Sequence, residues 1–167
     1  MVKGEHLNTA AREVLDLPVA KRIDHIRRPR WIGYPRAKQL LAKLDDLFTH
    51  PKTHRMPNLL IVGYTNAGKT MLANRFVQGH RADDNPDGDV AIVPVLAIQA
   101  PPGPDESRFY NTILEALSAP HNPRERVAQK QFQVLRLLKQ IGLRMLIIDK
   151  VHNILTGPGT KQRQFLN

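Results

Sequence analysis

The clearest chemistry lies in a glycine-rich segment, GYTNAGKT, at residues 63–70. It fits the pattern G-x-x-x-x-G-K-[ST] at every fixed position. Gly63 and Gly68 allow the backbone to curl so that its N–H groups point at phosphate oxygens. Lys69 is expected to reach the β- and γ-phosphates, and the Thr70 hydroxyl to bind Mg²⁺. The alternative is a glycine-rich turn with an incidental lysine. The predicted nucleotide-binding residues of this loop are Gly63, Tyr64, Thr65, Asn66, Ala67, Gly68, Lys69 and Thr70.

A second acidic position completes the predicted site. Folds with such a loop hold Mg²⁺ through a carboxylate at the end of another buried strand. The run Leu-Ile-Ile-Asp ends at Asp149, 80 residues after Lys69. Thr70 and Asp149 are therefore the predicted Mg²⁺ ligands. The alternative is that Asp149 only caps the segment that follows the strand.

The next residue is unusual for an ATPase. Many such enzymes place a glutamate after the aspartate to polarise the attacking water, whereas this chain has Lys150. An ammonium group cannot accept a proton from water at its ordinary pKa, and it competes with Mg²⁺ for Asp149. One interpretation is a site that binds nucleotide but hydrolyses it poorly, and another is a substitution in a protein no longer under selection. His152 is a conceivable substitute base but fits better as an ordinary polar residue, so no catalytic residue is assigned.

The predicted strands and helices that must position these residues alternate along the chain. Apolar runs at 59–63, 90–98 and 144–149 predict buried parallel strands, the second of them irregular at Pro94. Helical patterns follow at 69–78, 107–118 and 123–141. This alternation predicts an α/β fold, with a parallel sheet flanked by helices over residues 58–167.

Residues 1–57 read as an N-terminal helical and linker segment. Helices are expected at 7–16, 18–28 and 35–49, with Pro29 ending the second and Pro35 in the first turn of the third. Between these helices, the segment RPRWIGYP is an extended linker. It contains Trp31 and Tyr34.

Composition limits the class of protein. The chain has 167 residues, a net charge of +10 and no cysteine, which excludes disulfide scaffolds and Cys-based metal sites. Its apolar runs fall short of the roughly 18 residues of a membrane span, and the N-terminus lacks a secretion signal. A soluble, cytoplasmic protein without a membrane partner is expected. The basic residues around Trp31 and Tyr34 suggest contact with a nucleic-acid backbone, or else a solvated helix face followed by a basic linker.

Three segments together resemble the TniB family. They are RPRWIGYPRAKQLLAKLDDLFTHPKTHRMPNLLIVGYTNAGKT, LRMLIIDKVHNIL and RQFLN. TniB proteins are AAA-type ATPases of bacterial transposons that carry mercury-resistance genes and integrons, and they are similar to the transposition regulators TnsC and MuB. The resemblance implies that 63–70 is Walker A and that Asp149 ends Walker B. It also places Trp31 or Tyr34 near the nucleotide base, although these aromatic residues could equally anchor the linker to the core.

The resemblance further implies ATP and Mg²⁺ as cofactors, in a bacterial cytoplasmic protein. Its partners would be DNA, bound without sequence preference, and a DDE transposase of the TniA type, with possible homo-oligomers. The family has glutamate at the position of Lys150, and its members continue beyond the position of Asn167. The AAA-type P-loop NTPase domain is therefore expected to be incomplete at its C-terminus. It would lack the strand between the phosphate-loop strand and the Asp149 strand, which leaves unpaired edges.

Three functions remain open from the sequence. The first is an ATP-binding transposition protein that assists a DDE transposase in target selection, with impaired hydrolysis. The second is a truncated, non-catalytic fragment that binds the transposase or intact TniB. The third is another P-loop protein, such as a helicase loader or a signalling ATPase.

Overall fold

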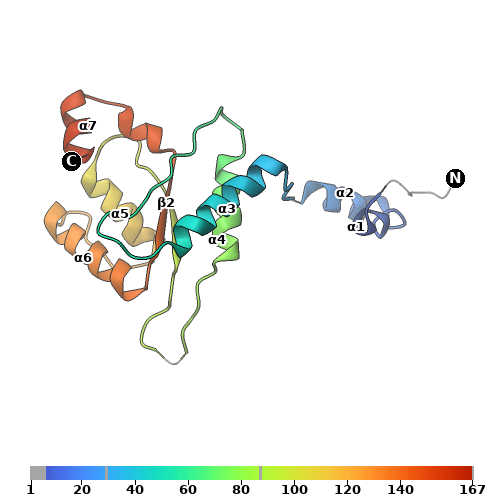
Figure 1. Ribbon diagram of the computed structural model, residues 1–167, viewed down its shortest axis with the longest axis horizontal. Helices are drawn as coiled ribbons and strands as arrows, with labels where there is room; N and C mark the ends of the chain where they lie inside the picture. Colours follow the sequence, from blue (N-terminus) through green and yellow to red (C-terminus); the bar gives the residue numbers. More distant parts are fainter. Residues whose placement is uncertain (1–6, 29, 87, 167) are drawn as a thin grey trace. The chain divides into compact units, whose positions relative to one another are not determined.

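A computed structural model describes residues 7–28, 30–86 and 88–166 (Figure 1). The chain forms two compact units, Met1–Gly33 and Tyr34–Asn167. The first contains α1 (Thr9–Arg12) and α2 (Val19–Arg27). The Asn8 side chain caps α1 by accepting the N–H of Ala11 at 2.9 Å. Both helices are shorter than predicted, and the proposed helix terminator Pro29 lies outside the described residues.

The second unit is built around a two-stranded parallel sheet. Strands β1 (Val95–Gln99) and β2 (Met145–Asp149) pair in register, from Val95 opposite Met145 to Gln99 opposite Asp149. β1 begins later than the predicted start at residue 90, because Pro94 has no N–H to donate to a ladder. The Pro94 carbonyl instead accepts the N–H groups of Arg144 and Met145. The predicted pairing of parallel strands is thus confirmed for two of the three apolar runs.

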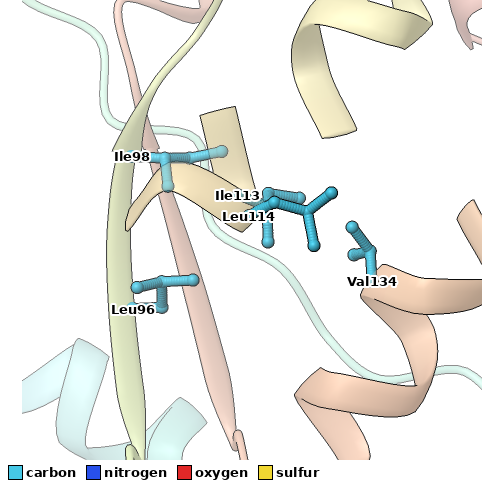
Figure 2. Close-up of a cluster of buried hydrophobic side chains, with 5 residues drawn as sticks. All are labelled: Leu96, Ile98, Ile113, Leu114 and Val134. Atoms are coloured by element: carbon cyan, nitrogen blue, oxygen red, sulfur yellow. The ribbon is translucent and has the colours of Figure 1, made fainter. Parts of the chain in front are cut away.

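Helices cover both faces of this sheet (Figure 1). On one face lie α5 (Glu106–Ala116) and α6 (Val127–Gln140), and Figure 2 shows side chains from both strand and helices meeting there. On the other face lie α3 (Pro35–Thr49) and α4 (Lys69–Gly79). The first cluster contains Leu96, Ile98, Ile113, Leu114 and Val134, and the second contains Leu44, Phe76 and Val95. Alternate residues of β1 face opposite layers, as the pleat of a strand requires.

The bounds of α3 agree with the sequence prediction, and α4, α5 and α6 differ from it by a few residues at their ends. Pro35 at the first helical position supplies a preset φ angle where no N–H is needed. After β2 the chain continues into η1 (Val151–Leu155) and α7 (Gly159–Leu166), for which the sequence offered no prediction. Phe165 of α7 meets Phe109 of α5 edge to face, with ring centroids 5.5 Å apart.

The predicted buried strand over residues 59–63 is wrong. This segment has no regular secondary structure, and the side chains of Leu60 and Val62 are 69% and 83% exposed. A strand exists only when its backbone groups pair with a neighbour, and no described strand pairs with this segment. The apolar composition therefore does not by itself bury these residues. The fold is a mixed helix and strand arrangement compatible with an incomplete α/β P-loop domain.

In the part of the chain that the structure describes, the helices are all too short or too polar to cross a bilayer.

Candidate nucleotide-binding site

The predicted phosphate loop joins the exposed segment 59–62 to the start of α4. It turns at Tyr64, whose carbonyl accepts the N–H of Ala67 at 3.2 Å. Gly68 has φ 81° and forms the N-cap of α4, without a side-chain cap. Asn66 also adopts a positive φ, 62°, which asparagine tolerates better than most residues. The first N–H groups of α4 are therefore not satisfied by a cap and can bind an anion.

The two motif glycines differ in what this conformation demands of them. A Cβ atom on Gly68 would meet no other atom within 4 Å, so a side chain would fit the space there. Its cost would come from the left-handed backbone, which residues other than glycine adopt unfavourably. Gly63 does not have a positive φ, and a Cβ on it would lie 3.6 Å from the Cβ of Ala67, an ordinary contact. Gly68 is the glycine that the observed loop requires.

Lys69 lies over the loop that precedes it. Its Nζ donates to the carbonyl oxygens of Gly63 and Tyr64, both at 2.8 Å. An ammonium group has three donors, so one more remains for a further acceptor such as a phosphate oxygen. The ammonium group of Lys69, which was predicted to bind phosphate, thus lies at the N-terminal end of α4. The helix dipole also favours an anion at this end.

Thr70 and Asp149 are brought into direct contact although 79 residues separate them. The Thr70 hydroxyl donates to Oδ2 of Asp149 at 2.6 Å, a distance typical of a hydrogen bond to a charged carboxylate. Oδ1 of the same carboxylate accepts the backbone N–H of Lys150 at 2.8 Å. The end of β2 and the first turn of α4 therefore place both predicted Mg²⁺ ligands at one point.

This pair fits a magnesium ion bound together with phosphate. Mg²⁺ takes oxygen ligands, and commonly only one or two from the protein, with water and phosphate supplying the rest. Thr70 and Asp149 provide a hydroxyl and a carboxylate. Within the described ranges, no three His, Cys, Asp or Glu side chains gather as a metal cluster. A magnesium ion held by Thr70 and Asp149 would take its remaining ligands from water and phosphate.

Lys150 and His152 follow directly after the site. Lys150 has φ 54°, a left-handed conformation, and forms the N-cap of η1. Both side chains line the same groove as Lys69 and Asp149. Neither the structure nor the sequence supplies a carboxylate at the position where the general base was sought, so no catalytic residue is assigned.

The two aromatic residues of the linker fall into different units. Trp31 lies at the end of the first unit, and Tyr34 opens the second as the N-cap of α3, 48% exposed. Their proposed place beside a nucleotide base stays a prediction.

A groove of about 600 Å³ extends from the phosphate loop along β2. Its lining includes residues 59–61 and the residues of β2. Leu44 and Leu47 of α3 also line this groove, although no residue of this helix was predicted to belong to the site. Their helical spacing marks an apolar face but does not show which element that face meets.

A family model described as bacterial TniB protein matches residues 22–167, which include the loop, Asp149 and Lys150. No curated protein matches the chain.

Proposed function

Because this chain belongs to the TniB family, a family of transposition proteins, we propose that it binds ATP with Mg²⁺ and assists a DDE transposase in choosing target DNA. The family establishes the association with transposition. The nucleotide, the metal ion and the transposase of the TniA type are the proposal.

The observation that carries the proposal is the contact between Thr70 and Asp149, next to Lys69. A P-loop site needs a hydroxyl and a carboxylate for the metal, a lysine for the phosphates, and backbone donors at a helix start. All four features occur here around the first turn of α4. The residues proposed to hold the nucleotide are those of the loop, 63–70, together with Asp149.

In this proposal each group has one task. Gly68 and the first N–H groups of α4 receive the phosphates, and Lys69 neutralises their charge. Thr70 and Asp149 hold the magnesium ion, which would draw the phosphate oxygens together and offset their negative charge. Lys150 adds a positive charge beside Asp149 and supplies no proton acceptor, so hydrolysis is expected to be slow.

The proposed DNA contact rests on charge. The described part of the first unit carries Lys21, Arg22, Arg27 and Arg28 on or next to α2, all exposed. Lysine and arginine bind the phosphate backbone without reading base sequence. Homo-oligomers and a location in the bacterial cytoplasm belong to the same proposal.

One observation favours the alternative, a non-catalytic fragment that binds the transposase or another TniB protein. On α2 the apolar residues Val19, Ile23 and Ile26 are 69%, 43% and 75% exposed and share one helical face. Such a stripe could receive a protein partner without any nucleotide.

Titration with a fluorescent ATP analogue and Mg²⁺ separates the two functions. The wild-type chain should bind saturably and Lys69→Ala should bind at least about tenfold more weakly, because a charged phosphate contact is lost. Lys139→Ala is the matched control, since Lys139 is an exposed lysine of α6 and does not line the groove. No binding by the wild-type chain, or equal binding by Lys69→Ala, would leave only the fragment function.

A further inference from the structure

Helix α6 carries on its outer side a row of exposed residues, which we call the α6 stripe. The stripe consists of Ala128, Phe132, Leu135 and Lys139, which follow one another at intervals of four, three and four residues. Residues at these intervals lie along one side of a helix. Phe132 is 69% exposed and Leu135 is 60% exposed, although both are large apolar side chains. An apolar row of this kind on a helix surface is a feature of protein-binding surfaces.

A hollow of about 740 Å³ lies beside the stripe, between α6 and the loop that precedes it. Ala128 and Phe132 line the hollow from the helix, and Pro120, His121 and Asn122 line it from the loop. The stripe and the hollow therefore form one continuous surface. The hollow gives an apolar side chain of a partner a place to enter next to Phe132.

The loop wall of the hollow is held in place from inside the protein. Lys130 is completely buried, and its Nζ donates to the Pro123 carbonyl and to the Ser107 hydroxyl, both at 2.8 Å. The Gln133 side chain donates to the Pro120 carbonyl at 2.8 Å. Because a buried ammonium group is costly without hydrogen bonds, these contacts fix the loop to α5 and α6. A surface whose shape is set before binding loses little conformational entropy when a partner docks.

The stripe lies apart from the edge of the sheet at which a further strand is expected. Lys130 and Val134 turn towards the core, so the stripe points away from the sheet. A strand added beside β2 would extend the sheet layer and would not cover this outward side of a helix. α7 lies on the other side of α5 from α6 (Figure 1), because its Phe165 meets Phe109, whereas Ser107 of α5 contacts α6.

The charges and spacing of α6 indicate what kind of partner would fit. α6 contains no Asp or Glu, and Arg136 and Lys139 are exposed near the C-terminal end of the stripe. Intervals of four, three and four residues are those of a coiled-coil seam, which receives another helix. Basic residues beside such a seam favour carboxylates on the partner helix.

A second copy of this chain does not supply such a helix through its own α6. Two α6 stripes would offer no carboxylate from α6 to Arg136 or Lys139, and each chain carries a net charge of +10. A nucleic acid would match the charge but would leave Phe132 and Leu135 against a polar backbone. Complementarity therefore favours an acidic amphipathic helix of another protein.

We propose that the α6 stripe and the adjoining hollow bind an acidic amphipathic helix of a partner protein. The apolar residues of that helix pack on Phe132 and Leu135, and its carboxylates pair with Arg136 and Lys139. No residue of the stripe lines the nucleotide groove, so this interaction goes beyond nucleotide binding and does not require it.

The test uses the full chain without nucleotide and a fluorescent peptide made of three repeats of Leu-Glu-Ala-Leu-Glu-Ala-Glu. Fluorescence anisotropy gives the affinity, and amide chemical shifts of ¹⁵N-labelled protein locate the contact. We expect saturable binding, with shift changes concentrated on α6 and on residues 120–125. A peptide of the same composition in scrambled order keeps the charge but lacks an apolar stripe, and should bind about tenfold or more weakly. A peptide with lysine in place of glutamate should be weakened similarly.

Two matched variants test the stripe itself. Leu135→Asp places a negative charge in it, whereas Leu155→Asp makes the same change in η1, at a residue 63% exposed and outside the hollow. Leu135→Asp should weaken peptide binding about tenfold, because it removes apolar contact and repels the carboxylates. Leu155→Asp should leave the affinity unchanged, which separates an effect at the stripe from an effect of net charge. Replacing Arg136 and Lys139 together with alanine should also weaken binding about tenfold.

Several results would overturn the proposal. No saturable binding, or equal binding of the scrambled peptide, would show that the stripe recognises no acidic helix. Unchanged chemical shifts on α6 would place any binding elsewhere. A dimer of the free chain that Leu135→Asp dissociates would assign the stripe to a second copy, and displacement of the peptide from α6 by duplex DNA would assign it to nucleic acid. None of these results bears on ATP binding, which Lys69→Ala tests separately.

Discussion

At the scale of single residues, the contact between Thr70 and Asp149 is the central feature. The structure places their oxygen atoms 2.6 Å apart. Thr70 was predicted as a Mg²⁺ ligand from the phosphate-loop motif, and Asp149 from its place at the end of an apolar run that reads as a buried strand. The sequence could not indicate that the Lys69 ammonium lies on the carbonyls of Gly63 and Tyr64, since that contact depends on the conformation of the loop.

The two glycines of the loop should respond differently to alanine. Gly68→Ala places a Cβ on a backbone with φ 81° and should lower the free energy of unfolding by about 1 kcal/mol. Gly63→Ala meets only the ordinary contact with Ala67 and should change stability little. Urea denaturation of both variants checks this difference. Equal losses would show that the loop has another conformation.

The Thr70 hydroxyl should matter for the metal more than for the fold. Thr70→Val keeps the shape of the side chain but removes the oxygen, so the increase in ATP affinity on adding Mg²⁺ should largely disappear. Thr112→Val is the control, because the Thr112 hydroxyl donates to the Arg108 carbonyl within α5 and Thr112 does not line the groove. ATP titrations with and without Mg²⁺ measure the effect, and an unchanged Mg²⁺ dependence in Thr70→Val would remove Thr70 from the site.

At the scale of elements, the pattern of apolar and polar residues in the sequence predicted helices better than strands. The bounds of α3 were predicted, with Pro35 in its first turn, because the signals that start and continue a helix are local. The run at 59–63 has the composition of a buried strand, yet a strand depends on a neighbour that no local pattern reveals. Lys130 of α6 is fully buried, and its Nζ donates to Ser107 and Pro123. A charged residue at a core position cannot be recognised from hydrophobic periodicity.

The packing of α5 against the sheet and α6 should dominate the stability of the second unit. Leu114 is completely buried among Leu96, Ile98, Ile113 and Val134 (Figure 2). Leu114→Ala should therefore cost about 2–5 kcal/mol of unfolding free energy. Leu135→Ala, on the exposed face of α6, should cost less than about 0.5 kcal/mol. Chemical denaturation of both variants tests the assignment of the two faces, and similar losses would contradict it.

At the scale of the whole molecule, the basic charge is the property most relevant to the proposed DNA partner. The net charge of +10 was evident from composition, whereas the division into units at Gly33 was not, because it depends on contacts distant in sequence. α3 belongs to the second unit, whereas the sequence-based prediction placed it in an N-terminal segment of residues 1–57. The family match spans this division, beginning within α2.

DNA binding should be sensitive to salt and insensitive to sequence. Replacing Arg27 and Arg28 with alanine should weaken binding to two unrelated duplexes equally and reduce the slope of log affinity against log salt by up to about two. Replacing Arg136 and Lys139, exposed residues of α6, provides the control with the same charge change. Electrophoretic mobility shifts over a series of salt concentrations give both quantities. A loss confined to one duplex would indicate base recognition instead.

The most direct test of the account is the Mg²⁺ dependence of ATP binding in Asp149→Asn, measured by calorimetry. This change keeps the size of the side chain and an oxygen for Thr70, but removes the charge that would hold the metal ion. We expect Mg²⁺ to strengthen ATP binding by the wild-type chain and by Asp46→Asn, an exposed control on α3, and to have little effect on Asp149→Asn. An equal effect of Mg²⁺ on all three proteins would show that Asp149 does not hold the metal ion and would contradict the proposed site.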